Sequence, residues 1–216
     1  MFVKLWMKEN PIVITQEQTL SEADAVMREH AIRRLPVVDA DNSLVGIITR
    51  EDILKAVPID ASLDDAAVGG QSPVAAFMTA SPITADPMDP LETATHTMRK
   101  NKIGGLPVVS HDGTLTGIIT ESDICRALMD ILGAEEGGAR IELQIGKTAR
   151  EVYEAFKIFK DFDMLVKTVA VYPGFSENHQ LLTIRLQGDE LENMLDALWK
   201  SGCKIHRILV TDNNQE

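Results

Sequence analysis

The feature that most constrains this 216-residue chain is an internal repeat. The tetrapeptides LPVV and GIIT each occur twice, and in both cases the copies lie 71 residues apart. Without a gap, residues 3–56 align with residues 74–127, and 22 of the 54 aligned positions are identical. A duplicated unit of this size has little core of its own and buries its apolar faces against its copy. We therefore expect two repeats, at 1–56 and 74–132, that are joined by a linker at 57–73 and pack into one compact domain.

Each repeat is predicted to contain a short strand, a helix, two strands and a second helix. Leu20, Ala23 and Met27 stand at helical spacing and have counterparts 71 residues later, so each trio predicts the buried face of a first helix. The LPVV and GIIT segments flank a polar turn, which is typical of paired strands. A second helix is expected to start at Thr49 in one repeat and at Thr120 in the other. The pattern is β-α-β-β-α, twice.

Charge and cysteine content exclude several classes of protein. The formal net charge of −12 repels phosphodiester backbones, so we expect no nucleic-acid partner. Two distant cysteines, Cys125 and Cys203, form no disulfide framework and favour a reducing, cytoplasmic compartment. We see no signal-peptide core and no apolar run of about 18 residues, so no membrane insertion is expected.

The chain shows no pattern of catalytic or metal-binding residues. Its five histidines are scattered without the spacing of a metal site, and no phosphate-binding glycine loop or nucleophile elbow is present. Cys125 lies in a predicted apolar helix and is expected to be a buried small side chain rather than a nucleophile. The sequence therefore predicts no catalytic residue, no metal site and no required cofactor.

At this point the motifs resemble a known family. A methionine closely followed by a proline, then LPVV, then G-I-I-T-x-x-D, occurs in this order in both repeats and resembles a tandem pair of cystathionine-β-synthase-type (CBS) repeats, or Bateman module. The resemblance covers about residues 3–132. It implies an α+β fold in which two CBS repeats stack, and a ligand-sensing regulatory protein rather than an enzyme.

Two threonine–aspartate pairs open the predicted second helices. Thr49 and Asp52, like Thr120 and Asp123, have the spacing of a capping box, in which both side chains satisfy backbone donors at a helix start. The same geometry also suits a nucleotide, because a helix start offers N–H groups to phosphate and a carboxylate accepts hydrogen bonds from ribose hydroxyls. Each threonine–aspartate pair can therefore both cap its helix and bind a ligand.

The resemblance assigns roles to these pairs. It implies that Asp52 and Asp123 hold the ribose of an adenosine ligand, with Thr49 and Thr120 near its phosphate. It also implies that the early strand of the other repeat completes each cleft, with apolar side chains beside the adenine. The residues expected in the first cleft are Thr49, Asp52, Ser81, Ile83 and Thr84, and those expected in the second are Asn10, Ile12, Val13, Thr120 and Asp123.

The repeats differ just before LPVV, where one carries Arg33-Arg34 and the other Gly104-Gly105. Guanidinium groups bind phosphate bidentately, whereas glycines add only backbone contacts. We therefore expect the Thr49/Asp52 cleft to prefer phosphorylated ligands and the Thr120/Asp123 cleft to be weaker, empty or selective for an uncharged nucleoside. The alternative is that the two arginines form a solvated pair on a loop.

A third segment follows a predicted hinge at 133–138. Residues 139–212 show the order βαββαβ, which is the ferredoxin-like pattern. After a CBS pair this order resembles an ACT-like domain, and the arrangement resembles acetoin utilisation proteins of the AcuB type. ACT domains often bind amino acids at the first strand-to-helix loop through an aspartate that the loop at 146–150 lacks. The alternative role is pairing with another subunit.

These observations predict a regulatory protein that binds an adenosine-containing ligand between its CBS repeats and passes its state to a homodimer, or to a regulated enzyme or transporter. The candidate ligands are AMP, ADP, ATP, S-adenosylmethionine and NADH. The competing hypothesis is a structural scaffold for dimerisation or partner binding whose clefts are vestigial.

Overall fold

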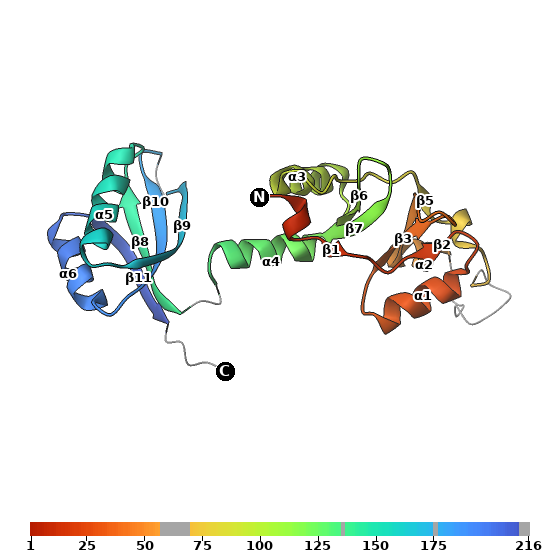
Figure 1. The fold of residues 1–216 in the computed structure, drawn as a ribbon, viewed down its shortest axis with the longest axis horizontal. Coiled ribbons are helices and arrows are strands. Elements are labelled where there is room, and N and C mark those ends of the chain that lie inside the picture. The colour runs from red at the N-terminus through yellow and green to blue at the C-terminus, as the bar shows by residue number, and fades with distance from the viewer. Residues whose placement is uncertain (57–69, 135–136, 175–176, 212–216) are drawn as a thin grey trace. The chain divides into compact units, whose positions relative to one another are not determined.

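The structure is a computed structural model that describes residues 1–56, 70–134, 137–174 and 177–211 (Figure 1). The chain divides into two compact units, Met1–Cys125 and Arg126–Glu216. Most of the linker predicted at 57–73 and two residues of the hinge predicted at 133–138 lie outside the described residues.

The two repeats of the N-terminal unit contain equivalent elements in the same order, except that an isolated bridge between Ala85 and Val108 takes the place of β2 in repeat two. Repeat one contains η1 (Val3–Leu5), β1 (Lys8–Glu9), β2 (Ile14–Thr15), α1 (Leu20–Glu29), β3 (Arg34–Val38), β4 (Leu44–Thr49) and α2 (Arg50–Ala56). Repeat two contains η2 (Val74–Ala76), β5 (Thr79–Ala80), α3 (Leu91–Asn101), β6 (Gly105–Val109), β7 (Leu115–Thr120) and α4 (Glu121–Ile131). The predicted helices and paired strands are confirmed. The early strand of repeat one is divided into β1 and β2, because Asn10 turns the chain between them with a positive φ of 47°.

The repeats exchange their early strands. One sheet has the order β2-β3-β4-β5, and the other has the order β1-β7-β6. Strand β5 of repeat two pairs with β4 of repeat one, where Thr79 lies opposite Ile47, while β1 of repeat one pairs with β7, where Lys8 lies opposite Ile118. Each sheet therefore contains a strand from the other repeat, so neither repeat completes its sheet alone.

The repeated glycines of the GIIT segments make room for this exchange. A Cβ atom on Gly46 would collide with Sδ of Met78 and lie 3.2 Å from the carbonyl oxygen of Thr79. In the equivalent place, a Cβ atom on Gly117 would lie 2.7 Å from Sδ of Met7. The methionine of each repeat thus packs over the glycine of the other. This contact explains why a methionine and a glycine occur at these positions in both repeats.

The core of repeat one lies under α1. Leu20, Ala23 and Met27 are buried, as their spacing predicts, and pack in one cluster with apolar residues of β3 and β4. A capping box starts this helix, because Thr19 Oγ1 accepts a hydrogen bond from the backbone N–H of Glu22 and the Glu22 carboxylate accepts one from the N–H of Thr19. The predicted first helix is therefore capped at its start and packed against the sheet along its buried face.

The expectation that Cys125 is buried is wrong, because its side chain is exposed. In α4 the buried positions are Asp123 and Ala127, four residues apart and on one face. Cys125 follows Asp123 by two residues, and at about 100° per residue this places it on the opposite face. The apolar composition of the helix did not reveal which face is covered.

The C-terminal unit confirms the predicted βαββαβ order. It consists of β8 (Gly138–Ile145), α5 (Ala149–Asp161), β9 (Leu165–Pro173), β10 (Gln180–Gln187), α6 (Leu191–Lys200) and β11 (Lys204–Thr211). The antiparallel sheet has the order β11-β8-β10-β9, and both helices lie on the same side of it (Figure 1). Its core contains alternate residues of β8 and β10 packed against Phe159 of α5 and Met194 and Leu198 of α6.

Among the described residues, no helix has the length and apolar character needed to cross a membrane.

Candidate functional site

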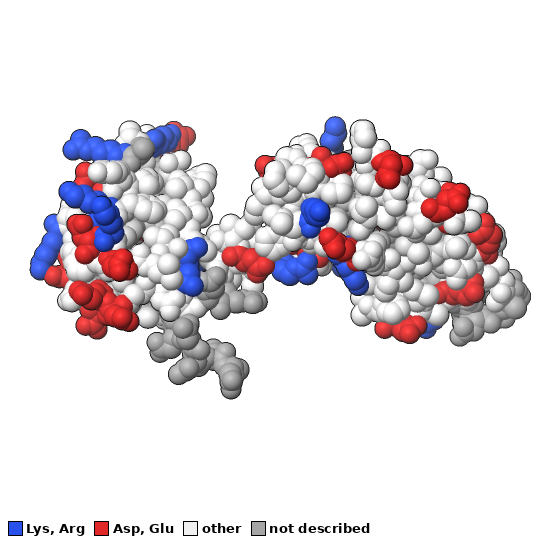
Figure 2. All heavy atoms as spheres, in the orientation of Figure 1, with Lys and Arg blue, Asp and Glu red and all other residues white. Residues whose placement is uncertain are grey.

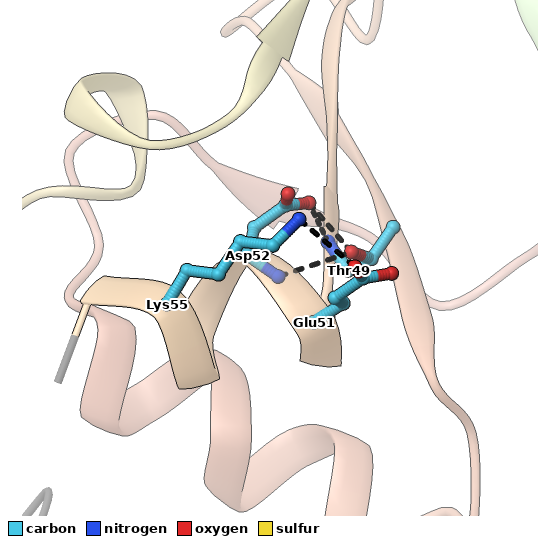
Figure 3. A network of polar contacts seen from close by, with 4 residues as sticks. All are labelled: Thr49, Glu51, Asp52 and Lys55. Atoms are coloured by element: carbon cyan, nitrogen blue, oxygen red, sulfur yellow. Dashed lines mark hydrogen bonds and ion pairs between the residues drawn. The ribbon is translucent and has the colours of Figure 1, made fainter. Parts of the chain in front are cut away.

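The Thr49–Asp52 pair forms a capping box at the start of α2 (Figure 3). Oδ2 of Asp52 accepts hydrogen bonds from the backbone N–H of Thr49 at 2.9 Å and from Thr49 Oγ1 at 2.6 Å. Thr49 Oγ1 in turn accepts a hydrogen bond from the Asp52 N–H at 3.3 Å. Next to it, Glu51 and Lys55 form an exposed ion pair with a 2.9 Å separation. Capping is confirmed, and it uses Oδ2 of the Asp52 carboxylate.

Repeat two builds the same arrangement at the start of α4. Oδ2 of Asp123 accepts hydrogen bonds from Thr120 N–H at 2.9 Å and from Thr120 Oγ1 at 2.6 Å. Asp123 is more enclosed than Asp52, with 9% of its surface exposed. The repeat therefore places two threonine–aspartate pairs in equivalent local geometry.

We expect Thr49→Ala to lower the free energy of unfolding of the N-terminal unit by about 1 kcal/mol, because the helix loses its side-chain cap. Urea unfolding followed by circular dichroism measures the change. Thr148→Ala is the matched control, since Thr148 precedes α5 without a side-chain capping bond and its loss should change little. Equal effects of the two variants would contradict a capping role for Thr49.

The first cleft lies beside Asp52 and has a volume of about 480 Å³. Repeat one contributes β4 and α2 with Thr49 and Asp52, and repeat two contributes Ile83 from the segment after β5. Pairing of β4 with β5 brings these segments together. The residues that line the cleft are Arg33, Arg34, Ile47, Thr49, Arg50, Glu51, Asp52, Thr79, Pro82, Ile83, Lys102, Ile103, Gly104, Gly105, Pro107 and Glu121.

The second cleft lies beside Asp123 and has a volume of about 280 Å³. Repeat two contributes Thr120 and Asp123, and repeat one contributes Ile12, brought close by the pairing of β1 with β7. The lining residues are Lys8, Pro11, Ile12, Ala31, Ile32, Arg33, Arg34, Pro36, Gly104, Ile118, Thr120, Glu121, Ser122 and Asp123. Each cleft is thus completed by the other repeat, as the family resemblance implies.

Four of the residues expected in the clefts, Asn10, Val13, Ser81 and Thr84, are not among the described residues that line them. Asn10 and Ser81 occupy equivalent positions and share a positive φ of 47°, just before Pro11 and Pro82. They therefore shape the turn that leads from the exchanged strand into the cleft.

The expectation that arginines serve one cleft and glycines the other is wrong in its geometry, because Arg33 and Arg34 line both clefts. Nη1 of Arg34 donates a hydrogen bond to the carbonyl oxygen of Gly104. A Cβ atom on Gly104 would lie 2.7 Å from Nη2 of Arg34, and one on Gly105 would collide with Nη1. The two glycines of repeat two therefore leave space for the Arg34 guanidinium at the junction of the clefts.

The Arg34 guanidinium is partly buried at this junction. Burial lowers its pKa from the ordinary arginine value, and the neighbouring Arg33 lowers it further, while Glu121 and Asp123 raise it. The guanidinium stays protonated because arginine does not lose its proton in proteins. A fixed positive charge therefore lines both clefts.

Sequence reasoning missed five charged residues of the clefts, of which Glu51 lines the first. Arg50 and Lys102 line the first cleft, Lys8 lines the second, and Glu121 lines both. Arg50 and Glu121 are equivalent in the repeat alignment, directly after Thr49 and Thr120, so the alignment contained a signal for this pair.

Cationic side chains outnumber anionic ones in both clefts, although the chain as a whole has a formal net charge of −12. On the face of the N-terminal unit that Figure 2 shows, acidic side chains are spread widely and the few basic side chains lie among them. A local excess of positive charge suits a small anionic ligand better than an extended polyanion.

The C-terminal unit has a cavity of about 270 Å³ next to the loop at 146–150. Gly146, Glu151, His179, Cys203 and Lys204 are among its lining residues. Glu151 folds back onto the loop, and its Oε2 accepts a hydrogen bond from Gly146 N–H at 2.6 Å. In the described part of the chain, no group of three or more histidine, cysteine or acidic side chains is placed to hold a metal ion.

Exchanged strands and paired clefts define a duplicated two-repeat module, and comparison with known proteins identifies its family. A family model described as the CBS domain matches residues 3–59 and 74–130, which is more than half of the chain. The chain belongs to the family of CBS-domain proteins. The family match ends at residue 130, so most of the C-terminal unit lies outside it.

Curated relatives share the CBS region. The chain is 33% identical over 134 residues to a CBS domain-containing protein of Dictyostelium discoideum, a match that covers 60% of this chain and 92% of that protein. It is 35% identical over 136 residues to inosine-5′-monophosphate dehydrogenase of Mycobacterium tuberculosis, covering 62% of this chain but only 24% of the enzyme. The relation to that enzyme is therefore confined to about a quarter of its length.

Solved structures of CBS-domain proteins are also similar to this chain. The CBS domain pair of protein MJ0100, in complex with 5′-methylthioadenosine and S-adenosyl-L-methionine, is 32% identical with a TM-score of 0.52 and covers 63% of this chain and 98% of that one. CBSX2 in complex with AMP is 28% identical, with a TM-score of 0.52 and coverages of 60% and 97%. A Vibrio cholerae protein assigned to acetoin utilization (AcuB) is 30% identical, with a TM-score of 0.54 and coverages of 62% and 95%. The predicted tandem CBS pair is confirmed.

Proposed function

We propose that this chain is a regulatory protein that binds an adenosine-containing nucleotide in the clefts between its CBS repeats. The observation that carries the proposal is that each cleft combines an aspartate, a shared arginine pair and an isoleucine from the other repeat. The carboxylates of Asp52 and Asp123, which also cap the helices, are the proposed acceptors for ribose hydroxyls. Arg33 and Arg34 are proposed to bind phosphate, while Ile83 and Ile12 contact the adenine.

The comparisons support an adenosine ligand. CBSX2 binds AMP, and the CBS pair of MJ0100 binds 5′-methylthioadenosine and S-adenosyl-L-methionine. The cationic lining of both clefts favours AMP, ADP or ATP over uncharged nucleosides in this chain. The partial match to a dehydrogenase falls on a quarter of that enzyme, so we propose binding rather than catalysis here.

Regulation requires two states that bind the ligand with different affinity. We propose that an occupied cleft biases the packing of the two repeats, and that a homodimer, a partner enzyme or a transporter responds. We further propose that the C-terminal unit is an ACT-like domain that pairs with a second copy of this chain. Its edge strand β9 supports pairing, because Leu165, Val169 and Val171 are exposed.

The direct test is a thermal-shift screen of the full chain with AMP, ADP, ATP, S-adenosylmethionine, NADH and cyclic dinucleotides. A ligand that binds only the folded state adds about 2.7 kcal/mol of stability at a hundredfold excess over Kd, so binding of AMP is expected to raise the melting temperature of the N-terminal unit. The double variant Asp52→Ala/Asp123→Ala is expected to lose this shift, because both proposed ribose acceptors are gone.

Glu22→Ala is the matched control for this double variant. Glu22 is also the carboxylate of a capping box in the N-terminal unit, but it is not among the described residues that line a cleft. Its removal should lower stability while the shift with AMP persists. If no compound in the screen produces a shift, the scaffold hypothesis replaces ligand sensing.

A further inference from the structure

The Arg34 guanidinium belongs to two clefts at once. Arg34 lies opposite Thr49 in the pairing of β3 with β4, and Gly105 lies opposite Thr120 in the pairing of β6 with β7. Positions 34 and 105 are therefore equivalent in the two repeats. They also meet in space, since a Cβ atom on Gly105 would collide with Nη1 of Arg34.

This meeting point has room for one long side chain. A Cβ atom on Gly105 would also lie 2.9 Å from the carbonyl oxygen of Ile119, so backbone as well as the guanidinium occupies the space around position 105. The hydrogen bond from Arg34 to the Gly104 carbonyl holds the guanidinium at the repeat-two side of the junction. Arg34 is thus the partly buried guanidinium that the two clefts share, while Arg33, which also lines both clefts, is exposed.

We propose that the Arg34 guanidinium, which the two clefts share, binds phosphate in only one of them at a time, so that anionic ligands in the two clefts compete for it and weaken one another's binding. A guanidinium binds one phosphate bidentately through a planar fork, and turning the fork toward one cleft withdraws it from the other. The second ligand then meets Glu121, whose carboxylate lines both clefts, with Arg33 but without Arg34 to offset its charge. Uncharged nucleosides do not need Arg34 and should fill the clefts independently.

This inference rests on the proposed function, and its test uses AMP and adenosine as probes of the full chain. Isothermal titration calorimetry gives the overall constant for binding two AMP molecules to the wild type. Asp123→Ala leaves only the first cleft able to bind AMP, and Asp52→Ala leaves only the second. The two variants therefore give the binding constants of the single clefts. The coupling factor is the overall constant divided by the product of the single-cleft constants.

For AMP we expect a coupling factor below about one fifth in the wild type, within the usual range of coupling between sites. Repeated in an Arg34→Gln background, the same set of measurements should give a factor near one. Adenosine should give a factor near one in both proteins. Arg34→Lys keeps the charge and should keep the coupling for AMP, which separates loss of charge from loss of packing.

Lys102→Gln is the matched control, because Lys102 is a cation that lines the first cleft but not the second. It should weaken AMP binding and leave the coupling factor unchanged. A single AMP per chain in the wild type that becomes two in Arg34→Gln would also support sharing.

Several outcomes overturn the inference. The first two are a coupling factor for AMP that is the same in Arg34→Gln as in the wild type, and a factor for adenosine equal to that for AMP. The others are a coupling factor for AMP of one or more in the wild type, and binding of a single AMP per chain in both the wild type and Arg34→Gln. Binding of neither AMP nor adenosine to the wild type would instead overturn the proposed function itself, and this inference with it.

Discussion

Replacement of Phe159 by alanine is expected to lower the free energy of unfolding of the C-terminal unit by about 3–5 kcal/mol. Phe159 is 1% exposed and is among the largest fully buried side chains of the molecule. Its ring packs edge-on against Phe156 with 5.7 Å between centroids, inside the cluster that α5 and α6 form with the sheet. Alanine would leave a cavity that these elements cannot close without moving.

Hydrogen exchange at increasing urea concentration, read over peptides of β8 and β10, measures this loss separately from the N-terminal unit. Tyr153→Ala is the control on the same helix, because the Tyr153 side chain is 68% exposed and should contribute little. A loss below about 1 kcal/mol for Phe159→Ala would show that this side chain is not in a tightly packed core.

The second large effect is expected at the glycine where the repeats interlock. Gly46→Val should lower the free energy of unfolding of the N-terminal unit by about 1–3 kcal/mol, because its side chain would occupy the space of Met78 and approach the Thr79 backbone. Gly117→Val should act in the same direction through Met7, its equivalent partner. Hydrogen exchange over β4 and β5 reports the change where it arises.

A double-mutant cycle tests the cause of this loss. Met78→Ala removes the side chain that lies over Gly46, so the combination with Gly46→Val should cost less than the two single variants added together. The expected coupling is about 0.5–3 kcal/mol, as for side chains in direct contact. Simple additivity would mean that Met78 does not fill the space above Gly46.

The repeat made most of this fold predictable from sequence. Because the two repeats align without a gap at an offset of 71 residues, the same local patterns occur in both. The burial of Leu20 and the strand pair around the polar turn were therefore each supported by two copies of the pattern. The pairs Thr49/Asp52 and Thr120/Asp123 were predictable for the same reason, since a capping box is a local structure. Periodicity alone was sufficient for the βαββαβ order after residue 138.

The details of the clefts were less predictable, because they depend on how the repeats stack. In the sequence, Arg33-Arg34 and Gly104-Gly105 occupy equivalent positions, so they were predicted to line one charged and one uncharged cleft. In the structure they are the two halves of one contact, in which glycines accept the side chain that the other repeat supplies. The exposure of Cys125 was missed for a related reason, since it depends on which face of α4 meets the rest of the unit.

The exchange of β1 and β5 also bears on how the chain folds during synthesis. Lys8 precedes its strand partner Ile118 by 110 residues, so the partner is made only after most of both repeats. The edge of β4 likewise stays open until Thr79 has been added. Contacts between residues so distant in sequence slow folding, so the first repeat should remain incomplete, and open to protease or chaperone, until the second has been translated.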